Sequence, residues 1–387
     1  MSTTADWLLD PDIAYLNHGA FGALPRAVGE YAVELRRQME ANPTGLLARR
    51  LPGLLDDVRG QVAELLRADP DACVFVANAT AGSAAVLTAL APMLEAGDEV
   101  VTTDHRYGAV GIQLEALAAR TGARIVTAHV PLDAATSTDV VAAITERFTS
   151  RTRLLVVDSI SSPSGFVFPV EQIVATSHER GIAVLVDAAH APGQIEVDLR
   201  ALGADFWVGN LHKWICSPRA AAVLCIADRW RADVRPLVPS HGYPAGFQPA
   251  FDWTGTLDPT PILAVPAALA FWSEYGWERM RGTQRATVDD GAASVAKALG
   301  TSAPVADEFR AAMRIIELPV TLGRETGLRL EARLSNDYRV EVPIMQLHNR
   351  SWIRVCGQVY NDGADYDRLA AALPELLETE EGLETDG

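Results

Sequence analysis

The middle of the chain alternates short apolar runs with longer segments of helical pattern. The apolar runs lie at residues 73–76, 99–102, 124–127, 154–157, 183–186, 205–209 and 220–225, and helical patterns lie near 81–94, 108–120, 138–148 and 170–180. Strands and helices that alternate at this spacing are typical of strand–helix–strand units. We therefore predict an α/β fold in which a mainly parallel, seven-stranded sheet is covered by helices on both faces.

Polar residues stand where several of these predicted strands end. In open parallel sheets, ligands bind beyond the carboxyl ends of the strands. Asp104, Asp158, Asp187 and Lys213 all fall at or just after such ends. Aspartates at these places also form turns and cap helices, and this is the interpretation that we favour for Asp104.

Lys213 is one of only two lysines in the chain, the other being Lys297. Arginine is used nearly everywhere else, and arginine cannot lose its proton in a protein. A lysine at a strand end can lose its proton and attack a carbonyl group, so Lys213 indicates imine chemistry. The alternative is a bias toward arginine that left one lysine at this place.

The charge balance and the apolar pattern exclude several classes of partner. The net charge is −17, and no run of basic residues exceeds pairs such as Arg36-Arg37. Nucleic acids and anionic membranes would be repelled, which leaves small molecules as the expected partners. No stretch reaches the roughly 18 apolar residues that a membrane span needs, and the first residues show no basic segment followed by an apolar one. We expect a soluble cytoplasmic protein.

The four cysteines show no paired spacing. Cys73, Cys216, Cys225 and Cys356 are far apart, without a C-x-x-C pair. Neither a zinc site nor a disulfide framework is indicated, so we predict buried thiols and no metal site.

The pattern of predicted strands and helices changes after residue 258, which indicates a second domain. The length of 387 residues allows one. A Pro-rich connection at 258–261 is followed by a helix to about Tyr275, by strand-like segments at 313–319, 338–342 and 352–355, and by a closing helix at 365–377. We predict an N-terminal arm (1–30), a large domain (31–260), a smaller α+β domain (261–377) and a disordered acidic tail (378–387).

The imine chemistry suggests pyridoxal phosphate, which needs a lysine, a carboxylate at its ring nitrogen, donors for its phosphate and a flat group against its ring. Asp187 ends a buried strand and can keep the ring nitrogen protonated, although a structural Asp is the alternative. Residues 78–83 lie between a strand and a helix, where N–H groups and the hydroxyls of Thr80 and Ser83 can face a phosphate. Thr and Ser also cap ordinary helices.

Together these segments resemble the class V aminotransferase family of fold-type I pyridoxal phosphate enzymes, and within it the isopenicillin N epimerase-like branch. The resemblance covers nearly the whole chain. Its most telling pieces are YLNHGAFGALP at 15–25, NATAG at 78–82, VDAAH at 186–190, NLHK at 210–213, WTGTLDP at 253–259, and Arg354 followed by Tyr360-Asn361.

The resemblance implies a role for each cofactor residue. Lys213 would form the internal aldimine and then move the Cα proton through a quinonoid, and Asp187 would pair with the pyridinium. Tyr107 would stack on the ring, with His105 as a competing candidate. The other implied contacts are His190 at the phenolic oxygen, Thr80, Ala81, Asn210 and His212 at the phosphate, Asp158 as a further cofactor neighbour, and Thr256 as a phosphate contact given to a neighbouring subunit. A homodimer with shared active sites follows.

The resemblance also implies a substrate site for an amino acid. Arg354 would hold the α-carboxylate by a bidentate contact, with a surface ion pair as the alternative. His18 and Gly19, beside Asn17, and Ser162 would border the substrate. Arg49 or Arg50 would reach a neighbour's site, unless these exposed arginines are merely solvated.

The outcome of the reaction stays open at this point. Cysteine desulfurases share the fold, but the stretch before Arg354 has no cysteine, which disfavours persulfide chemistry. Epimerisation needs a second acid or base opposite Lys213, supplied by Tyr107, His105 or His18, whereas β-elimination by a C–S lyase needs only Lys213. We weigh these two about equally, within secondary metabolism. An aminotransferase or decarboxylating enzyme comes third, and a catalytically silent binding or regulatory protein is the alternative of another class.

Overall fold

The computed structural model describes residues 4–380, and its largest element is a seven-stranded sheet with the order β2-β8-β7-β6-β5-β3-β4. β8 runs antiparallel to both neighbours, and the remaining pairs are parallel. This confirms the predicted mainly parallel sheet. The strands are β2 (Cys73–Val76), β3 (Glu99–Thr103), β4 (Arg124–Ala128), β5 (Thr152–Asp158), β6 (Ala183–Asp187), β7 (Phe206–Asn210) and β8 (Ala222–Ile226).

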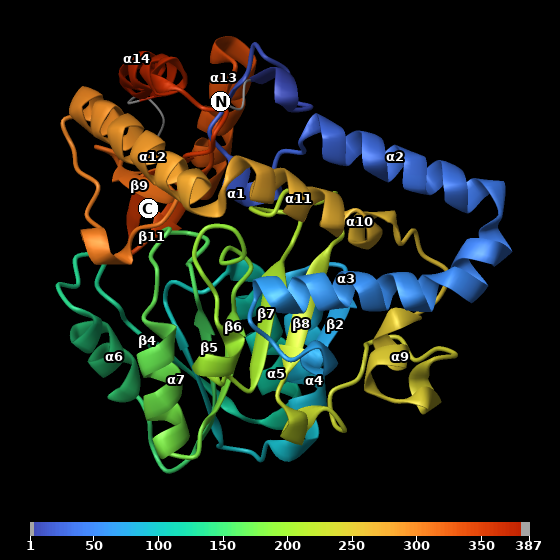
Figure 1. Cartoon of the computed structure of the whole chain (residues 1–387). Helices are drawn as coiled ribbons and strands as arrows, with labels where there is room; N and C mark the ends of the chain where they lie inside the picture. The colour runs from blue at the N-terminus through green and yellow to red at the C-terminus, as the bar shows by residue number, and fades with distance from the viewer. Residues whose placement is uncertain (1–3, 381–387) are drawn as a thin grey trace.

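Helices cover both faces of this sheet, as Figure 1 shows. Neighbouring residues of one strand point to opposite faces, so Val100 packs in the cluster that contains Leu114, and Val101 packs in the cluster that contains Ile144. Strands buried on both sides must be apolar throughout, which explains the continuous apolar runs. One face packs against α4 (Ala79–Leu90) and α5 (Gly108–Thr121), and the other against α3 (Leu51–Leu65), α6 (Ser137–Thr145) and α7 (Val170–Glu179).

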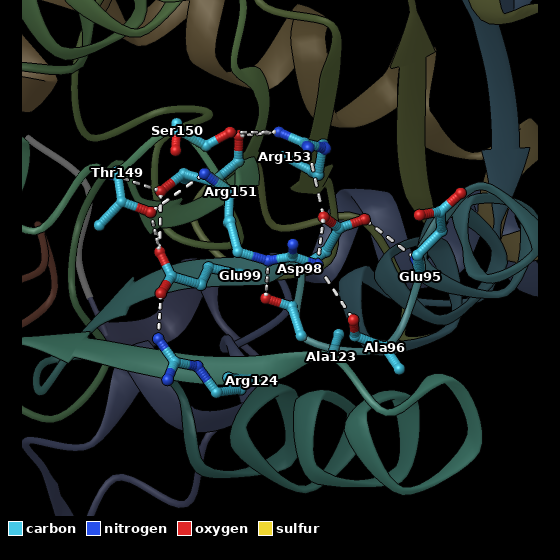
Figure 2. A network of polar contacts seen from close by, with 12 residues as sticks. Glu95, Ala96, Asp98, Glu99, Ala123, Arg124, Thr149, Ser150, Arg151 and Arg153 are labelled. Carbon is cyan, nitrogen blue, oxygen red and sulfur yellow. Dashed lines mark hydrogen bonds and ion pairs between the residues drawn. The ribbon is translucent and has the colours of Figure 1, made fainter.

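A charged network joins the amino ends of β3, β4 and β5, and Figure 2 shows it from close by. Buried Glu99 accepts a hydrogen bond from the Thr149 hydroxyl at 2.5 Å and pairs with Arg124. Buried Asp98 lies 3.3 Å from Arg153. The Thr149 hydrogen bond, with help from Arg124, holds the pKa of Glu99 below its usual value. These contacts stay at the end of the sheet away from Asp104, Asp158 and Asp187, so they serve structure.

A smaller antiparallel sheet, with the order β11-β12-β9, lies above the carboxyl ends of the large sheet (Figure 1). Its strands are β9 (Met313–Glu317), β11 (Ile344–Leu347) and β12 (Arg350–Cys356), and it packs with α12 (Trp277–Leu299), α13 (Arg324–Tyr338) and α14 (Gly363–Glu380). Residues 378–380 therefore continue α14, and the remaining residues of the predicted tail lie outside the described part of the chain.

The strand predicted at 338–342 is wrong in its extent. α13 continues through Tyr338, and Arg339 ends it in a left-handed conformation with φ of 58°. Only β10 (Val340–Glu341) is extended. The prediction missed that Leu330 and Leu334, one helical turn apart, point into the small-domain core.

The N-terminal segment runs along both sheets. β1 (Ala14–Tyr15) pairs with β10, α1 (His18–Phe21) follows it, and α2 (Arg26–Ala41) leads to α3. α8 (Leu199–Leu202) connects β6 to β7, and the segment between β8 and α12 contains α9 (Phe247–Asp252), α10 (Thr260–Leu263) and α11 (Val265–Tyr275). The domain boundaries at residues 30 and 260 stay predictions. None of the described helices is both long and apolar enough to cross a membrane.

Candidate active site

Three predicted residues meet where β5, β6 and β7 end side by side. Asp158 and Asp187 are the last residues of their strands and are direct partners in the register. Lys213 lies just beyond Asn210, the last residue of β7. Both aspartates are almost completely buried, with 2% and 4% of their surface exposed. The topology thus gathers two carboxyl groups and one amine at one edge of the sheet.

The surroundings of the Lys213 amine make its neutral form easier to reach than that of an ordinary lysine. Burial, together with the charge of Arg354, lowers the pKa of Lys213 to about 8, although the Asp187 carboxyl acts in the opposite direction. A neutral amine is a base and a nucleophile, whereas an ammonium ion is neither.

The hydrogen bonds around His190 agree with a neutral lysine. The indole N–H of Trp214 lies 3.3 Å from Nδ1 of His190, and an indole nitrogen can only donate. Burial is the main cause that holds the pKa of His190 well below its ordinary value, so the ring is neutral. Because Nδ1 accepts the indole N–H, the ring proton is on Nε2. That Nε2 lies 3.0 Å from Nζ of Lys213. In its unprotonated form the amine can accept this proton through its lone pair.

The two aspartates lack enough compensating charge. Burial, followed by the neighbouring Asp187, raises the pKa of Asp158 well above its usual value, and burial raises the pKa of Asp187. Oδ1 of Asp187 accepts the Ala189 N–H at 3.0 Å, but Oδ1 of Asp158 is buried without a hydrogen-bond partner among the described residues. A ligand with a cationic N–H group would supply the missing charge.

The N-terminal segment packs against the backbone of Lys213 through His18 and Gly22. Nδ1 of His18 accepts the Ala23 N–H at 3.2 Å, so Nε2 carries the proton and donates to the Lys213 carbonyl at 3.2 Å. Burial lowers the pKa of His18 to about 3. Gly22 has φ of 67°, and a Cβ there would come within 2.3 Å of the His212 carbonyl oxygen. His18, predicted to border the substrate, is thus buried beneath Lys213.

A second group of predicted residues meets at Arg354 on β12. The guanidinium donates from Nη1 to the Ser162 carbonyl at 2.6 Å and from Nη2 to Oδ1 of Asn17 at 3.1 Å. Its Nε is buried without a partner among the described residues. Gly19 lies next to this group, donating its N–H to Sγ of Cys356 at 3.3 Å. Arg354 is therefore held in place and keeps a donor free.

The predicted phosphate contacts gather at the first turn of α4. Asn78 caps the helix by accepting the Ala81 N–H at 2.9 Å, and Asn210 accepts the Ala79 N–H at 2.9 Å. Asn210 therefore joins the end of β7 to the helix N-terminus, which carries Thr80. Thr80 and the positive end of the helix dipole suit a phosphate, while the N–H groups of Ala79 and Ala81 serve to fix this turn.

His212 and Thr256 lie at the margins of this group. His212 donates from Nδ1 to the Ala221 carbonyl at 2.7 Å, and burial lowers its pKa to about 4, so Nε2 is an acceptor. A neutral acceptor is poorly suited to a phosphate dianion unless it takes up a proton.

Thr256 lies on an exposed segment between α9 and α10, where a residue that serves a neighbouring subunit has to lie.

The structure distinguishes Tyr107 from His105. Tyr107 precedes α5 with 41% of its surface exposed, and its backbone contacts Asp158. His105 is buried against Phe166, with Nδ1 on the Ser164 hydroxyl and Nε2 on the Val130 carbonyl, both at 2.8 Å. Burial lowers its pKa to about 4. Tyr107 remains the stacking candidate.

Sequence reasoning missed two residues of this site. Trp214 directly follows Lys213, and a donor-only side chain beside a lysine was the available signal. Gly22 belongs to the quoted segment 15–25, but its contact with His212 joins residues that are far apart in the sequence.

Comparisons with known proteins agree with this geometry. Residues 14–315 match the family model for aminotransferase class-V. The chain is 33% identical to an isopenicillin N epimerase of Amycolatopsis lactamdurans over 95% of this chain and 96% of the relative. It is 30% identical to an L-cysteine desulfhydrase of Arabidopsis thaliana over 94% of this chain and 88% of the relative.

Solved structures share the fold. A variant of C-DES with glycine covalently linked to its PLP cofactor has a TM-score of 0.83 at 20% identity, covering 96% of this chain and 99% of the other. The apo cysteine desulfurase of Thermococcus onnurineus NA1 has a TM-score of 0.82 at 19% identity, covering 97% and 98%. The predicted fold-type I architecture is confirmed.

Proposed function

The chain belongs to the class-V aminotransferase family of pyridoxal phosphate enzymes, and from this membership we propose that it is a C–S lyase, which removes the Cα proton of a cysteine-type substrate and releases its sulfur substituent. When bound, pyridoxal phosphate supplies an aldehyde for an amine and an electron-withdrawing ring that acidifies the Cα–H bond. The remaining steps depend on residues of this chain.

The residues present fit this cofactor. Lys213 offers an amine whose pKa is lowered to about 8, and Asp187 offers a buried carboxyl of raised pKa to a cationic ring nitrogen. The buried Oδ1 of Asp158 is a further acceptor next to it. The first turn of α4 offers Thr80 and the positive end of its dipole to a phosphate, and His190 carries its N–H on the side that faces the lysine.

Elimination is favoured because it needs only one base, and Lys213 is the candidate for it. Lys213 can take the proton from Cα, and His190 holds the lysine amine by Nε2–H. Epimerisation needs a second group on the opposite side. Of the three residues considered for that role, His18 and His105 are buried, have both ring nitrogens engaged, and have pKa values lowered to about 3 and 4. The engagement of both ring nitrogens in His18 and His105 is the observation on which we base the choice of elimination over epimerisation.

Arg354 supports an α-amino acid as the substrate. It is buried, is oriented by Ser162 and Asn17, and keeps Nε without a protein partner among the described residues. A planar guanidinium with a free donor can bind a carboxylate, and it would hold the Cα–H bond at a fixed angle to Lys213.

The sulfur would leave directly. Cys356, which follows Arg354 on β12, is fully buried, and burial raises the pKa of its thiol. A protonated thiol is a poor nucleophile, so it would not accept sulfur as a persulfide.

The test is to supply the purified holoenzyme with a cysteine S-conjugate and to measure pyruvate and free thiol. We expect the two products in equal amounts, with turnover abolished in Lys213→Ala. Cα–H exchange in deuterated water without pyruvate or thiol would contradict the C–S lyase.

Epimerisation is the second candidate. It is favoured by the exposed phenol of Tyr107 and by the 33% identity to an epimerase. Tyr107→Phe separates the two reactions: it would abolish inversion at Cα if Tyr107 were the second acid, whereas elimination would continue. Loss of optical purity in an L-amino acid without a leaving group is the measurement.

The proposal includes a homodimer in the cytoplasm. Leu237, Val238 and Leu257 are exposed near a cavity of about 590 Å³ that borders α4 and Thr254-Gly255. A second subunit would cover these apolar side chains and could bring its Thr256 to the phosphate. Light scattering on the holoenzyme gives the mass: a monomer would contradict the shared site.

A further inference from the structure

We propose that Asp104, His129 and His348 bind one divalent transition-metal ion, with Zn²⁺ as the test case, at the junction of the two domains. One ligand atom from each of these three residues lies within 4.8 Å of the other two. Two imidazoles and one carboxylate are a donor set that binds such ions. Sequence analysis considered cysteine spacing alone and predicted no metal site.

The two histidines converge on the same oxygen atom. Oδ2 of Asp104 lies 2.5 Å from Nδ1 of His129 and 2.8 Å from Nε2 of His348. The rings of the two histidines are 4.6 Å apart. Bonds from zinc to nitrogen and oxygen ligands are about 2.0–2.2 Å long, so small side-chain rotations would place one ion between the three atoms. The ion would replace the protons that now join them.

The large domain holds its two ligands rigidly. Asp104 follows β3 and His129 follows β4, and these strands are neighbours in parallel register. The Asp104 N–H donates to the Ala128 carbonyl at 3.0 Å, and the Val130 N–H donates to Oδ1 of Asp104 at 3.1 Å. Oδ1 is thereby occupied, and Oδ2 is the oxygen left for a ligand. Hydrogen bonds from a metal-binding side chain to protein groups outside the metal site orient that side chain toward the ion.

The small domain supplies the third ligand from a tight hairpin. His348 and Asn349 join β11 to β12, and their φ values are 54° and 58°. A two-residue loop with both φ values positive has a fixed shape. The indole of Trp352 donates to the Leu347 carbonyl at 3.0 Å, which braces the loop. His348 also packs edge-on against buried His105, with ring centroids 5.4 Å apart.

Exposure and the open coordination position suit an exchangeable ion. Asp104 and His348 are half-buried and His129 is exposed, so an ion can enter from solvent. Three protein ligands leave a position for water, as in zinc sites that are not closed. An ion bound here would fasten the hairpin to the loop that continues to Tyr107.

The experiment is a calorimetric titration of the holoenzyme with Zn²⁺ and, separately, with Mg²⁺. We expect one Zn²⁺ per chain and no comparable binding of Mg²⁺, which prefers oxygen ligands. Asp104→Asn, His129→Gln and His348→Gln should each weaken Zn²⁺ binding by at least ~100-fold, since even outer-shell changes cost ~10–100-fold.

The matched control is His178→Gln. His178 pairs with Asp205 at 2.9 Å without a second histidine in the pair, so its replacement should leave zinc binding unchanged. Zinc-edge X-ray absorption on the unaltered holoenzyme gives a readout that does not depend on any variant folding. Two imidazole ligands in that spectrum support the site. Equal zinc binding in the wild type and the three variants, or a spectrum without imidazole ligands, would overturn it.

Discussion

The indole N–H of Trp214 donates to Nδ1 of His190 at 3.3 Å, and this contact determines which nitrogen of His190 faces Lys213. With Nδ1 occupied as an acceptor, the neutral ring presents Nε2–H to the amine at 3.0 Å. The ammonium form is disfavoured there, because it would meet a donor. Trp214 therefore favours the neutral form of Lys213 through His190.

Trp214→Phe should raise the pKa of Lys213 above its value of about 8. Without the indole donor, His190 can carry its proton on Nδ1 and accept a hydrogen bond from the ammonium form. A net hydrogen bond is worth about 0.5–1.5 kcal/mol, which corresponds to a rise of up to about one pKa unit. Competitive acetylation of the apoprotein across pH, read by mass spectrometry at Lys213, measures the shift.

Trp272→Phe is the control for this measurement. Trp272 is also fully buried, but its indole donates to the Ile215 carbonyl at 3.0 Å and not to a histidine. The two variants remove the same atoms from similar surroundings. Equal pKa changes at Lys213 in both would contradict the role of Trp214, and ¹⁵N shifts of His190 would show the tautomer directly.

Gly22→Ala should destabilise the protein more than Gly203→Ala. Both glycines have positive φ, 67° and 64°, but ψ is 17° at Gly203 and 132° at Gly22. An alanine at Gly203 can adopt the left-handed region at a cost of about 1–2 kcal/mol, and the conformation of Gly22 is more strained for an alanine. Of the two, only Gly22 would bring the new Cβ against a backbone oxygen, that of His212 at 2.3 Å, while none of the described residues lies within 4 Å of a Cβ at Gly203. We expect an extra loss of about 1–3 kcal/mol in unfolding free energy, measured by urea denaturation. Equal losses would show that the close approach is unimportant.

The sequence predicted the large sheet well, and the physical reason lies in burial on two sides. The middle positions of strands such as β5 and β6 are buried on both faces and are apolar, so these runs stand out from the flanking helices. The small domain was harder, because α13 has a polar exposed face and its end at Tyr338 runs directly into β10. A helix and a strand without a turn between them give no local boundary.

The site residues likewise divide into those that could be predicted from the sequence and those that could not. Asp187 and Lys213 could be predicted because each stands at the end of a strand and carries a chemically distinctive group. The role of His18 could not, since it depends on the Ala23 N–H and the Lys213 carbonyl, and nothing local showed that both ring nitrogens would be occupied. The cluster of Asp104, His129 and His348 joins three distant segments and was missed for the same reason.

Arg354→Lys should weaken the use of amino-acid substrates by about 10–100-fold in kcat/KM, mainly through KM. Lysine keeps the charge but loses the planar fork, and hydrogen bonds to charged groups are worth about 1.5–3 kcal/mol. Arg350→Lys is the control, because Arg350 lies on the same strand but is exposed and pairs with Glu317. Steady-state kinetics with an S-conjugate checks both variants. An unchanged KM for Arg354→Lys would remove Arg354 from the substrate site.

The unfolding free energy of the apoprotein should depend on pH through Lys213. Its pKa is lowered from 10.5 to about 8 in the folded state, so between these values the unfolded chain binds more protons than the folded one. Stability therefore rises with pH over this window: the cost of burying the ammonium is fully present below about pH 8 and disappears by about pH 10.5. In Lys213→Met this dependence is absent.

The difference in unfolding free energy between the wild type and Lys213→Met isolates the contribution of Lys213, because the other groups titrate equally in both proteins. Relative to Lys213→Met, the wild type should gain about 1–3 kcal/mol between pH 7 and pH 10.5, measured by urea denaturation. Lys297→Met, which changes the exposed lysine near the end of α12, should keep the wild-type pH dependence. Parallel stability curves for the wild type and Lys213→Met would mean that the amine keeps its ordinary pKa in the folded apoprotein, and the base proposed for the Cα proton would then have to be another group.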